Sequence, residues 1–307
     1  MPIKVPDHLP AGKLLEAEGL FLIQEQIADR QDIRPLNIAL LNLMPLKQST
    51  EIQLARLIGA TPLQINLTLL TTSSYIPGNV SAQHLNSFYQ SWADVRTQKF
   101  DGLIITGAPI ETLPFETVKY WDELSQILDW TQSHVHRSLD ICWGAQAALY
   151  HFHKIPKHKL ADKAFGVYPH QIHHSTNPIL RGFSDEIRIP VSRHTETSAQ
   201  DIYGKDDLVT LIDSAHTGLC LIEDKSHRHL YMLNHLEYDA TTLGDEYQRD
   251  LAAGQNPILP YGYYPDDKAT NPPPNVWRSH AHLLFSNWIN QIYQSVPFDR
   301  NLIGTCA

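Results

Sequence analysis

One of the three cysteines in this 307-residue chain is placed where it could act as a nucleophile. Cys142 follows the apolar segment 138–141 and precedes the small-residue segment 144–149, so it lies between a predicted strand and a predicted helix. The positive end of a helix favours a thiolate, and the backbone N–H of Trp143 would point at a developing oxyanion. The pattern predicts a nucleophile elbow. A buried cysteine that only fills space would leave the same local pattern.

A nucleophilic cysteine needs a base, and the base needs a group that orients it. His235 and Glu237 follow the apolar segment 230–233. Side chains two positions apart in an extended segment point to the same side, so both could face one site. His235 alone could equally be a core histidine. The joint pattern predicts a triad of Cys142, His235 and Glu237.

These residues are held by segments that alternate between strand and helix from residue 34 onward. Compact apolar segments predict buried strands at 34–44, 63–72, 100–109 and 137–144, and amphipathic or small-residue segments predict helices at 47–59, 82–95, 118–134 and 145–152. The alternation predicts an α/β fold with an open, mainly parallel, doubly wound sheet and helices on both faces. Ligands bind such sheets at the carboxyl ends of the strands, which is where Cys142 lies.

The second half of the chain has a different pattern. Four apolar segments predict short strands, several of them antiparallel, at 186–195, 208–214, 218–225 and 227–238. Helices are expected at 239–254 and 277–295, with a proline-rich loop at 260–275 between them. We expect a single domain over 1–307, with an N-terminal arm at about 1–33 and an α/β core at about 34–300.

Composition narrows the possible partners. The formal net charge is −9 with both signs interspersed and without a basic run, which argues against nucleic-acid binding. The sequence predicts no membrane partner, because no apolar run approaches the ~20 residues of a membrane span. No signal-peptide core and no disulfide framework are evident, so a cytoplasmic location is expected. The seventeen histidines are scattered without a HExxH or paired CxxC motif, so no metal site is predicted.

The chain resembles the MetA-type homoserine O-acyltransferases from end to end. The resemblance is carried by spaced motifs that include MPIKVPDHLPA, LNLMPLKQSTEIQLARLIGATPLQI, FDGLIITGAP, ICWGAQAAL, FGVYPH, SRHTE, HLEYDA, EYQRD and WRSHAHLLFSNWIN. It implies a fold like that of class I glutamine amidotransferases, which is flavodoxin-like, and a homodimer. It also implies transfer of an acyl group to the side-chain hydroxyl of L-homoserine, for methionine biosynthesis.

The resemblance also implies roles for individual residues. Cys142 would carry the acyl group as a thioester, His235 would be the general base, and Glu237 would be its partner. Arg249 would bind the α-carboxylate of the amino acid, for which its guanidinium fork is suited. Lys163 and Ser192 would line the substrate site. The backbone N–H groups of Trp143 and Leu43 would hold the oxyanion.

The acyl donor is indicated by Glu111, which follows the segment TGAPI. In the family that this chain resembles, the corresponding residue is a glycine in succinyl users and a glutamate in acetyl users. A glutamate removes room and repels the terminal carboxylate of a succinyl group. Glu111 therefore favours acetyl-CoA as co-substrate, with no permanently bound cofactor. An exposed loop glutamate without a role is the simpler alternative.

The flank of the predicted base departs from the family pattern, and this leaves the acceptor open. Asn234 and Leu236 stand where the family usually has glycine and proline, which changes backbone freedom and bulk beside His235. L-serine, giving O-acetyl-L-serine for cysteine biosynthesis, is therefore an alternative acceptor. A succinyl-CoA user and a glutamine amidotransferase are further alternatives, although the amidotransferase pattern Gly-x-Cys-x-Gly lacks its first glycine here. The remaining alternative is a family member that has lost catalysis and serves as a binding module.

Overall fold

The computed structural model describes residues 34–74 and 82–305, with short pieces at 3–5, 13–14, 17 and 22–24. Apart from these pieces, the arm predicted at about 1–33 lies outside the described residues. Among the described helices, none combines the length and the apolar character needed to cross a membrane.

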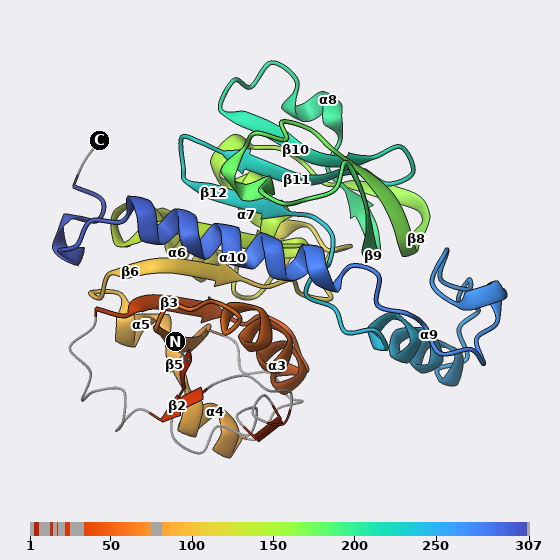
Figure 1. Cartoon of the computed structure of the whole chain (residues 1–307), viewed down its shortest axis with the longest axis horizontal. Coiled ribbons are helices and arrows are strands. Elements are labelled where there is room, and N and C mark those ends of the chain that lie inside the picture. The colour runs from red at the N-terminus through yellow and green to blue at the C-terminus, as the bar shows by residue number, and fades with distance from the viewer. Residues whose placement is uncertain are drawn as a thin grey trace.

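One half of the central sheet is parallel and follows the predicted alternation of strands and helices (Figure 1). The strand order is β2-β1-β4-β3-β6-β7-β12, with β5 also paired to β4. The bounds are β1 (Ile3–Val5), β2 (Leu22–Gln24), β3 (Leu36–Leu41), β4 (Ile65–Thr71), β5 (Tyr89–Ser91), β6 (Phe100–Ile105), β7 (Val135–Ile141) and β12 (His229–Met232). In register, Ile141 pairs with Met232 and Ile105 with Asp140, so the carboxyl ends of three strands meet at one edge.

The sheet continues beyond β12 with antiparallel strands, as expected for the second half. Their order is β12-β11-β10-β8-β9, with β11 (Gly218–Asp224), β10 (Leu208–Ser214), β8 (His158–Ile172) and β9 (Glu186–Glu196). The sequence analysis did not predict β8. The first half of that strand is polar and exposed, so it lacks the apolar alternation that would reveal it.

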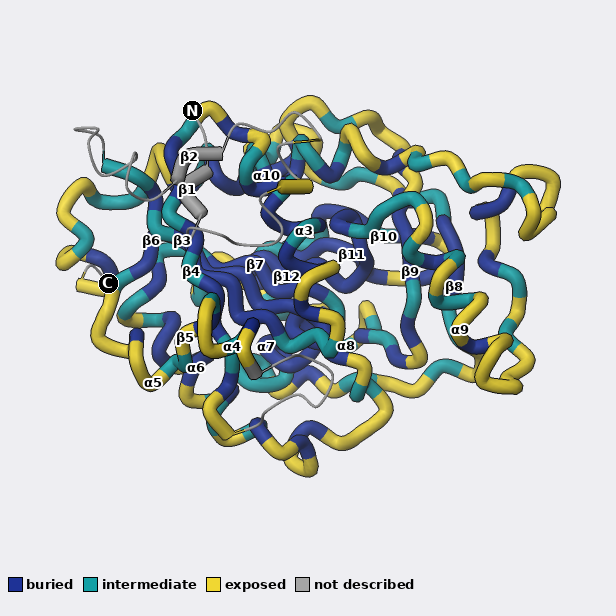
Figure 2. Tube along the Cα trace, turned by 90° about the horizontal axis from the view of Figure 1, so that it is seen from below, coloured by how far each residue is buried: buried dark blue, intermediate teal, exposed yellow. Residues whose placement is uncertain are grey.

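Helices cover both faces of the sheet. Helices α3 (Lys47–Ile58) and α10 (Arg278–Ser295) pack on one face, and α6 (Trp121–His134) and α7 (Trp143–His153) pack on the other. Alternate residues of β3 divide between the two cores: Ile38 packs with α3 and α10, and Ala39 packs with α6 and α7. The buried centre of the sheet is visible in Figure 2. The doubly wound α/β prediction is confirmed.

The remaining helices are short and lie at the periphery. They are α4 (Ala82–Phe88), α5 (Trp92–Val95), α8 (Ala199–Ile202) and α9 (Thr242–Ala252), with 3₁₀ turns at Phe115–Thr117, Pro178–Leu180, Pro265–Asp267 and Arg300–Leu302. The single helix predicted at 82–95 is wrong. The edge strand β5 interrupts it, because Tyr89 is buried with its hydroxyl on Glu51, and Ser91 begins α5 with a capping box to Asp94.

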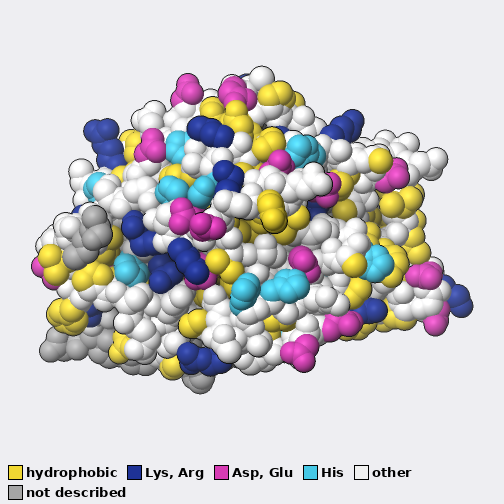
Figure 3. All heavy atoms as spheres, turned by 90° about the horizontal axis from the view of Figure 1, so that it is seen from above, with side chains coloured by type: hydrophobic (Ala, Val, Ile, Leu, Met, Phe, Trp, Pro, Cys, Tyr) yellow, Lys and Arg dark blue, Asp and Glu magenta, His cyan; other side chains and the backbone are white. Residues whose placement is uncertain are grey.

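The charge on the surface agrees with the composition. On the face seen in Figure 3, basic, acidic and histidine side chains are intermingled.

Candidate active site

Cys142 occupies a sharp turn between β7 and α7. Its backbone has φ 52° and ψ −115°, a conformation that non-glycine residues rarely adopt, and it caps the N-terminus of α7. Its backbone N–H donates to the carbonyl of Met232 at 2.7 Å, which fixes the turn to the neighbouring strand β12. The thiol is half-buried and is not part of a disulfide. The strained turn therefore presents the sulfur at the carboxyl edge of the sheet, next to a helix N-terminus.

Two glycines allow the turn to lie close to the end of β6. A Cβ at Gly107 would be 3.1 Å from the Cβ of Cys142, and a Cβ at Gly144 would be 2.7 Å from the carbonyl oxygen of Thr106. Side chains at either position would push α7 away from the sheet. The close approach of α7 to the end of β6 therefore gives both glycines a packing reason.

His235 lies beside Cys142 with Glu237 behind it. The strand β12 ends at Met232, so both residues lie in the following loop, where His235 Nδ1 is 2.6 Å from Glu237 Oε1. Burial favours the neutral imidazole, but the Glu237 carboxylate and a hydrogen bond with Cys142 raise the pKa of His235 well above its usual value. The ring of Tyr238 stacks on His235 at 4.1 Å. The structure thus brings the three predicted triad residues together, with the imidazole fixed on two sides.

The predicted substrate-site residues converge on a carboxylate that sequence analysis missed. Glu246 accepts hydrogen bonds from Lys163 Nζ at 2.7 Å and from Ser192 Oγ at 2.9 and 3.0 Å. Arg249 Nη2 lies 3.5 Å from the same carboxylate, and it also contacts Asp250 at 2.7 Å. Two sequence signals could have found Glu246: it opens the motif EYQRD, and it lies one helical turn before Arg249.

Tyr238 links this polar cluster to the triad. Burial raises the pKa of its phenol well above the usual value, and the charges of Glu246, Glu237 and Cys142 add to that effect. All these groups therefore lie near one partly buried ring. The Tyr238 carbonyl accepts a hydrogen bond from the indole of Trp277 at 2.8 Å, which anchors the loop on the C-terminal segment. The predicted acceptor residues and the predicted nucleophile thus border the same site.

Glu111 is fixed at the edge of this site. Its carboxylate accepts a hydrogen bond from the backbone N–H of His194 at 2.9 Å, so the loop after β6 is tied to β9. Burial lowers the pKa of the neighbouring Lys157 to about 8, and the Glu111 charge opposes that shift. Glu111 also acts on Tyr238. The side chain is therefore half-buried and held in place, unlike that of a free loop glutamate.

Trp143 and Leu43, the two residues predicted to hold the oxyanion by their backbone N–H groups, have different surroundings. Trp143 is the first residue of α7, directly after the nucleophile, and its indole is buried. The backbone N–H of Leu43 donates to Thr106 Oγ1 at 2.7 Å. Leu43 can therefore bind an oxyanion only after the Thr106 hydroxyl has moved away.

A buried lysine supports the loop that carries Leu43, and sequence analysis missed it too. Lys47 is 2% exposed, its Nζ donates to the carbonyl of Asn42, and its pKa falls to about 8 because burial disfavours its charge. Glu51 lies one turn further along α3 and opposes that shift. Perturbed titratable groups often gather at functional sites. Here the contact orders the 42–47 loop at the carboxyl edge of the sheet.

The two departures from the family pattern are directed into the core. Asn234 is fully buried, and its side-chain amide pairs with His170 at 2.9 Å and with Arg193 at 3.3 Å. Burial lowers the pKa of His170 to about 4, so this imidazole is neutral. Leu236 is 1% exposed and packs in the hydrophobic core. Both residues act on the base through the packing behind it.

Known proteins resemble this chain at two levels. The fold is shared with a glutamine amido transferase from Methylobacillus flagellatus (TM-score 0.55, 12% identity, covering 84% of this chain and 95% of that one). It is also shared with a glutamine amidotransferase from Thermotoga maritima (TM-score 0.51, 9% identity, covering 86% and 100%). These identities are low, so they speak for the fold alone, and the predicted glutamine-amidotransferase-like architecture is confirmed.

The sequence comparison is much closer. Proteins named homoserine O-acetyltransferase from Brucella canis and Brucella melitensis biotype 1 are 56% identical over 304 residues, with 99% of each chain covered. The model of the homoserine O-succinyltransferase family matches residues 2–298. With that span and that identity, the chain belongs to the homoserine O-succinyltransferase family.

Proposed function

We propose that this protein is a homoserine O-acetyltransferase that uses Cys142 to carry the acetyl group. One observation supports the chemistry above all others: a strained cysteine at a helix N-terminus contacts an imidazole that is itself held by a carboxylate. The full-length relatives named homoserine O-acetyltransferase support the substrate pair. Acetyl-CoA is a co-substrate in this proposal, and no permanent cofactor takes part.

The first half-reaction acetylates the enzyme. The Cys142 thiolate attacks the thioester carbonyl of acetyl-CoA, and a carbon–sulfur bond forms. The backbone N–H of Trp143 holds the oxyanion, joined by the N–H of Leu43 once Thr106 releases it. Collapse of the tetrahedral intermediate breaks the bond to coenzyme A, whose thiolate takes the proton of the His235 imidazolium. The raised pKa of His235 keeps that proton available at neutral pH.

The second half-reaction transfers the acetyl group to the acceptor. His235, now neutral, takes the proton of the homoserine hydroxyl as the oxygen attacks the acyl-cysteine. The tetrahedral intermediate collapses to the ester and the Cys142 thiolate. Glu237 stabilises the new imidazolium through its 2.6 Å contact with Nδ1. The reaction is therefore ping-pong, and coenzyme A leaves before the amino acid reacts.

The polar cluster around Glu246 has the charges that a zwitterionic amino acid requires. Glu246 would take the α-ammonium group, and Arg249 with Lys163 and Ser192 would take the α-carboxylate. In the structure, Glu246 holds Lys163 and Ser192 at 2.7–3.0 Å. The substrate would therefore exchange its own charges for these internal pairs. The Glu111 carboxylate beside the site would repel a succinyl carboxylate and leave room for acetyl.

Intact-mass analysis tests the covalent step. The protein mixed with acetyl-CoA alone should gain one acetyl group, and Cys142→Ser should gain none. A wild-type protein that releases coenzyme A in the complete reaction without ever gaining that group would rule out the thioester.

A coenzyme A release assay tests the substrates. It crosses acetyl-CoA and succinyl-CoA with L-homoserine and L-serine, and we expect the pair acetyl-CoA and L-homoserine to have the highest kcat/KM. Preference for L-serine would make the protein a serine O-acetyltransferase that works by the same chemistry. Glutaminase activity without acyl transfer would point to an amidotransferase, and absence of all turnover to a binding module.

The location and assembly follow from the same proposal. A catalytic thiol must stay reduced, which favours the cytoplasm. We expect a homodimer in solution, and light scattering coupled to gel filtration measures it. A monomeric mass would contradict the dimer and leave the proposed chemistry unaffected.

A further inference from the structure

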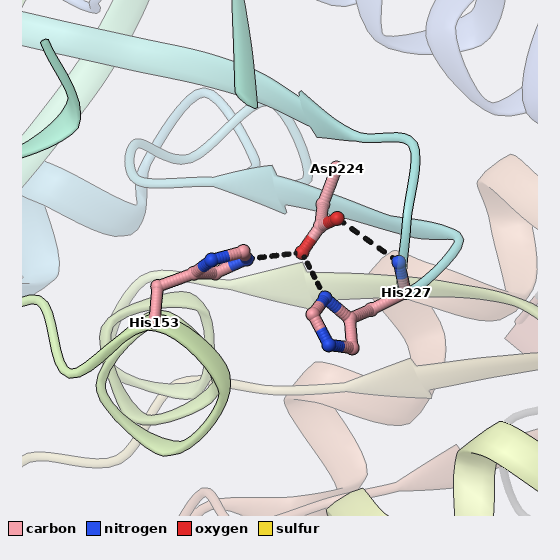
Figure 4. Close-up of side chains that lie close together, drawn as sticks. All are labelled: His153, Asp224 and His227. Atoms are coloured by element: carbon pink, nitrogen blue, oxygen red, sulfur yellow. Dashed lines mark hydrogen bonds and ion pairs between the residues drawn. The ribbon is translucent and has the colours of Figure 1, made fainter. Parts of the chain in front are cut away.

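Three side chains from separate parts of the chain meet at the C-terminal end of α7 (Figure 4). His153 is the last residue of α7, Asp224 is the last residue of β11, and His227 lies in the turn before β12. His153 Nε2 is 2.5 Å and His227 Nδ1 is 3.0 Å from Asp224 Oδ2. All three ligand atoms lie within 4.8 Å of one another.

The carboxylate at the centre is buried and ionised. The Asp224 side chain is 0% exposed, and its Oδ1 accepts from the Ser226 hydroxyl at 2.8 Å and from the His227 backbone N–H at 3.0 Å. The Tyr231 hydroxyl donates to Oδ2 at 2.8 Å. The hydrogen bonds from His153 and from these groups favour the charged form of the carboxyl, so the geometry supplies a negative charge.

The two imidazoles are oriented before any ligand arrives. The His227 ring stacks on Phe152 at 4.3 Å, and it lies at 88° to the ring of His153. The side chains of His153 and His227 are 10% and 27% exposed, so solvent reaches the site. The C-terminal end of α7 adds a partial negative charge, which favours a cation. The cluster is thus a preformed cation site with two nitrogen donors and one oxygen donor.

We propose that His153 Nε2, Asp224 Oδ2 and His227 Nδ1 bind a divalent transition-metal ion of the zinc class, with water in the remaining position. Two imidazoles and a carboxylate are a donor set that Zn²⁺ accepts, and imidazole suits Ni²⁺ and Cu²⁺ as well. Metal–ligand bonds of about 2.0–2.2 Å place tetrahedral ligand atoms about 3.3 Å apart. The contacts of 2.5 and 3.0 Å need to open by less than about 1 Å. Each imidazole binds the metal in its neutral form and releases its proton if it carried one.

The metal site would be structural: it would join two elements of the fold, and it would not be a second catalytic centre. α7 has 11 residues, so its C-terminal end lies about 16 Å along the helix from Cys142. The metal would join that end to the β11–β12 turn and would bind only the folded chain, which raises stability by mass action. The inference stands apart from the proposed acyl transfer. The sequence predicts no metal site because His153 lies 71 positions before Asp224.

The test uses the full chain in a Cys142→Ser background, which removes the half-buried thiol as a rival ligand. Metal-stripped protein is titrated with ZnCl₂ by calorimetry, in the presence of a competing chelator. We expect one equivalent to bind, with affinity at least about 100-fold weaker in His153→Gln and in His227→Gln. His151→Gln is the matched control, because His151 is on the same helix but pairs only with Asp129, which is 72% exposed. Its affinity should stay within about twofold of the parent.

Two further readouts keep the test decisive if a variant is less stable. Zn²⁺ should raise the melting temperature of the parent and of His151→Gln, and it should leave that of His153→Gln and His227→Gln unchanged. Binding should weaken from pH 7.5 to pH 6, because protons compete for the imidazoles. Absence of an equivalent that binds at micromolar Zn²⁺ would overturn the proposal. Equal binding in His153→Gln and His227→Gln would also overturn it and assign the metal to other surface histidines.

Discussion

Helix α7 has a histidine–carboxylate pair at each end, and the two pairs differ mainly in their third member. At the N-terminal end, His235 and Glu237 are 2.6 Å apart and face a thiol. At the C-terminal end, His153 and Asp224 are 2.5 Å apart and face a second imidazole. A thiol next to such a pair can form and break bonds to carbon, whereas a second imidazole adds a ligand atom. The neighbour of each pair is therefore what distinguishes the chemistry that we propose for the two ends.

The electrostatics of the two ends differ as well. At the N-terminal end, the pKa of His235 is raised because Glu237 and Cys142 favour its charged form although burial opposes it. At the C-terminal end, the hydrogen bonds around Asp224 lower the pKa of that carboxyl although burial opposes this. In the two proposals, the raised pKa at one end supplies a proton to a leaving group, and the charge at the other end attracts a cation.

Loss of the thiol should produce the largest effect. Cys142→Ser should lower kcat about 10⁴-fold or more, because a hydroxyl beside His235 is a poor nucleophile. The fold and the Zn²⁺ equivalent at the other end of α7 should persist. Coenzyme A release and intact mass measure the first effect, and circular dichroism checks the fold. Activity within tenfold of wild type would show that the thiol is not the nucleophile.

Loss of the orienting carboxylate should have the next largest effect. Glu237→Gln should lower kcat by about 10²–10⁴-fold, because the imidazolium loses its charged partner and its tautomer is no longer fixed. The pKa of His235 should fall, so pH–rate profiles should shift to lower pH. Asp129→Asn is the control, because it alters the exposed carboxylate partner of His151, a histidine on α7. Equal losses in the two variants would contradict a special role for Glu237.

Glu111→Gly should change the donor preference by a smaller factor. Removing the carboxylate that His194 holds opens room and removes a like charge, so the kcat/KM ratio of succinyl-CoA to acetyl-CoA should rise by about 10- to 100-fold. Glu116→Gln is the matched control, because Glu116 is an exposed carboxylate that also acts on Lys157. An unchanged ratio in Glu111→Gly would remove Glu111 from donor selection.

The smallest effects should appear in the pH dependence of stability, with opposite signs at the two ends. The raised pKa of His235 contributes to the free energy of unfolding. That contribution is complete below about pH 6.5 and is lost as the pH rises through the pKa in the folded state. The contribution from the lowered pKa of Asp224 is complete above about pH 4 and is lost as the pH falls through the pKa in the folded state.

Urea unfolding between pH 3 and 9 measures both contributions. Each should change the free energy of unfolding by at most about 1.4 kcal/mol per pH unit. Glu237→Gln should flatten the alkaline side of the stability curve, and Asp224→Asn should flatten the acidic side. Flattening on the same side in both variants would contradict the assignment of the two charges.

The elements that could be predicted are those whose signal lies within one segment. The parallel strands and the elbow at Cys142 follow from apolar runs and their boundaries, because buried parallel strands are apolar on both faces. The failures were the helix predicted at 82–95, the omitted strand β8 and the end of the strand predicted at 227–238, since β12 already ends at Met232. β5, which interrupts that helix, is an edge segment, whereas β8 lies between β10 and β9; in both, pairing with a neighbouring strand outweighs the local pattern.

The residues of the candidate site also fall into two groups: those that a single segment of sequence indicates, and those that only contacts between segments reveal. Cys142, His235 and Glu237 could be proposed because each follows a strand in the sequence. Glu246 could not, since its importance comes from Lys163 and Ser192, which lie 83 and 54 positions away.

The sequence alone determined the sheet, the elbow and the family, because these depend on local patterns and on motifs that extend over the whole chain. Only the tertiary structure decided that Leu43 is engaged by Thr106 and that Glu246 holds the acceptor residues. It also decided that two histidines meet at Asp224. The physical reason is that a contact between side chains depends on strand register and helix placement, which no single segment specifies.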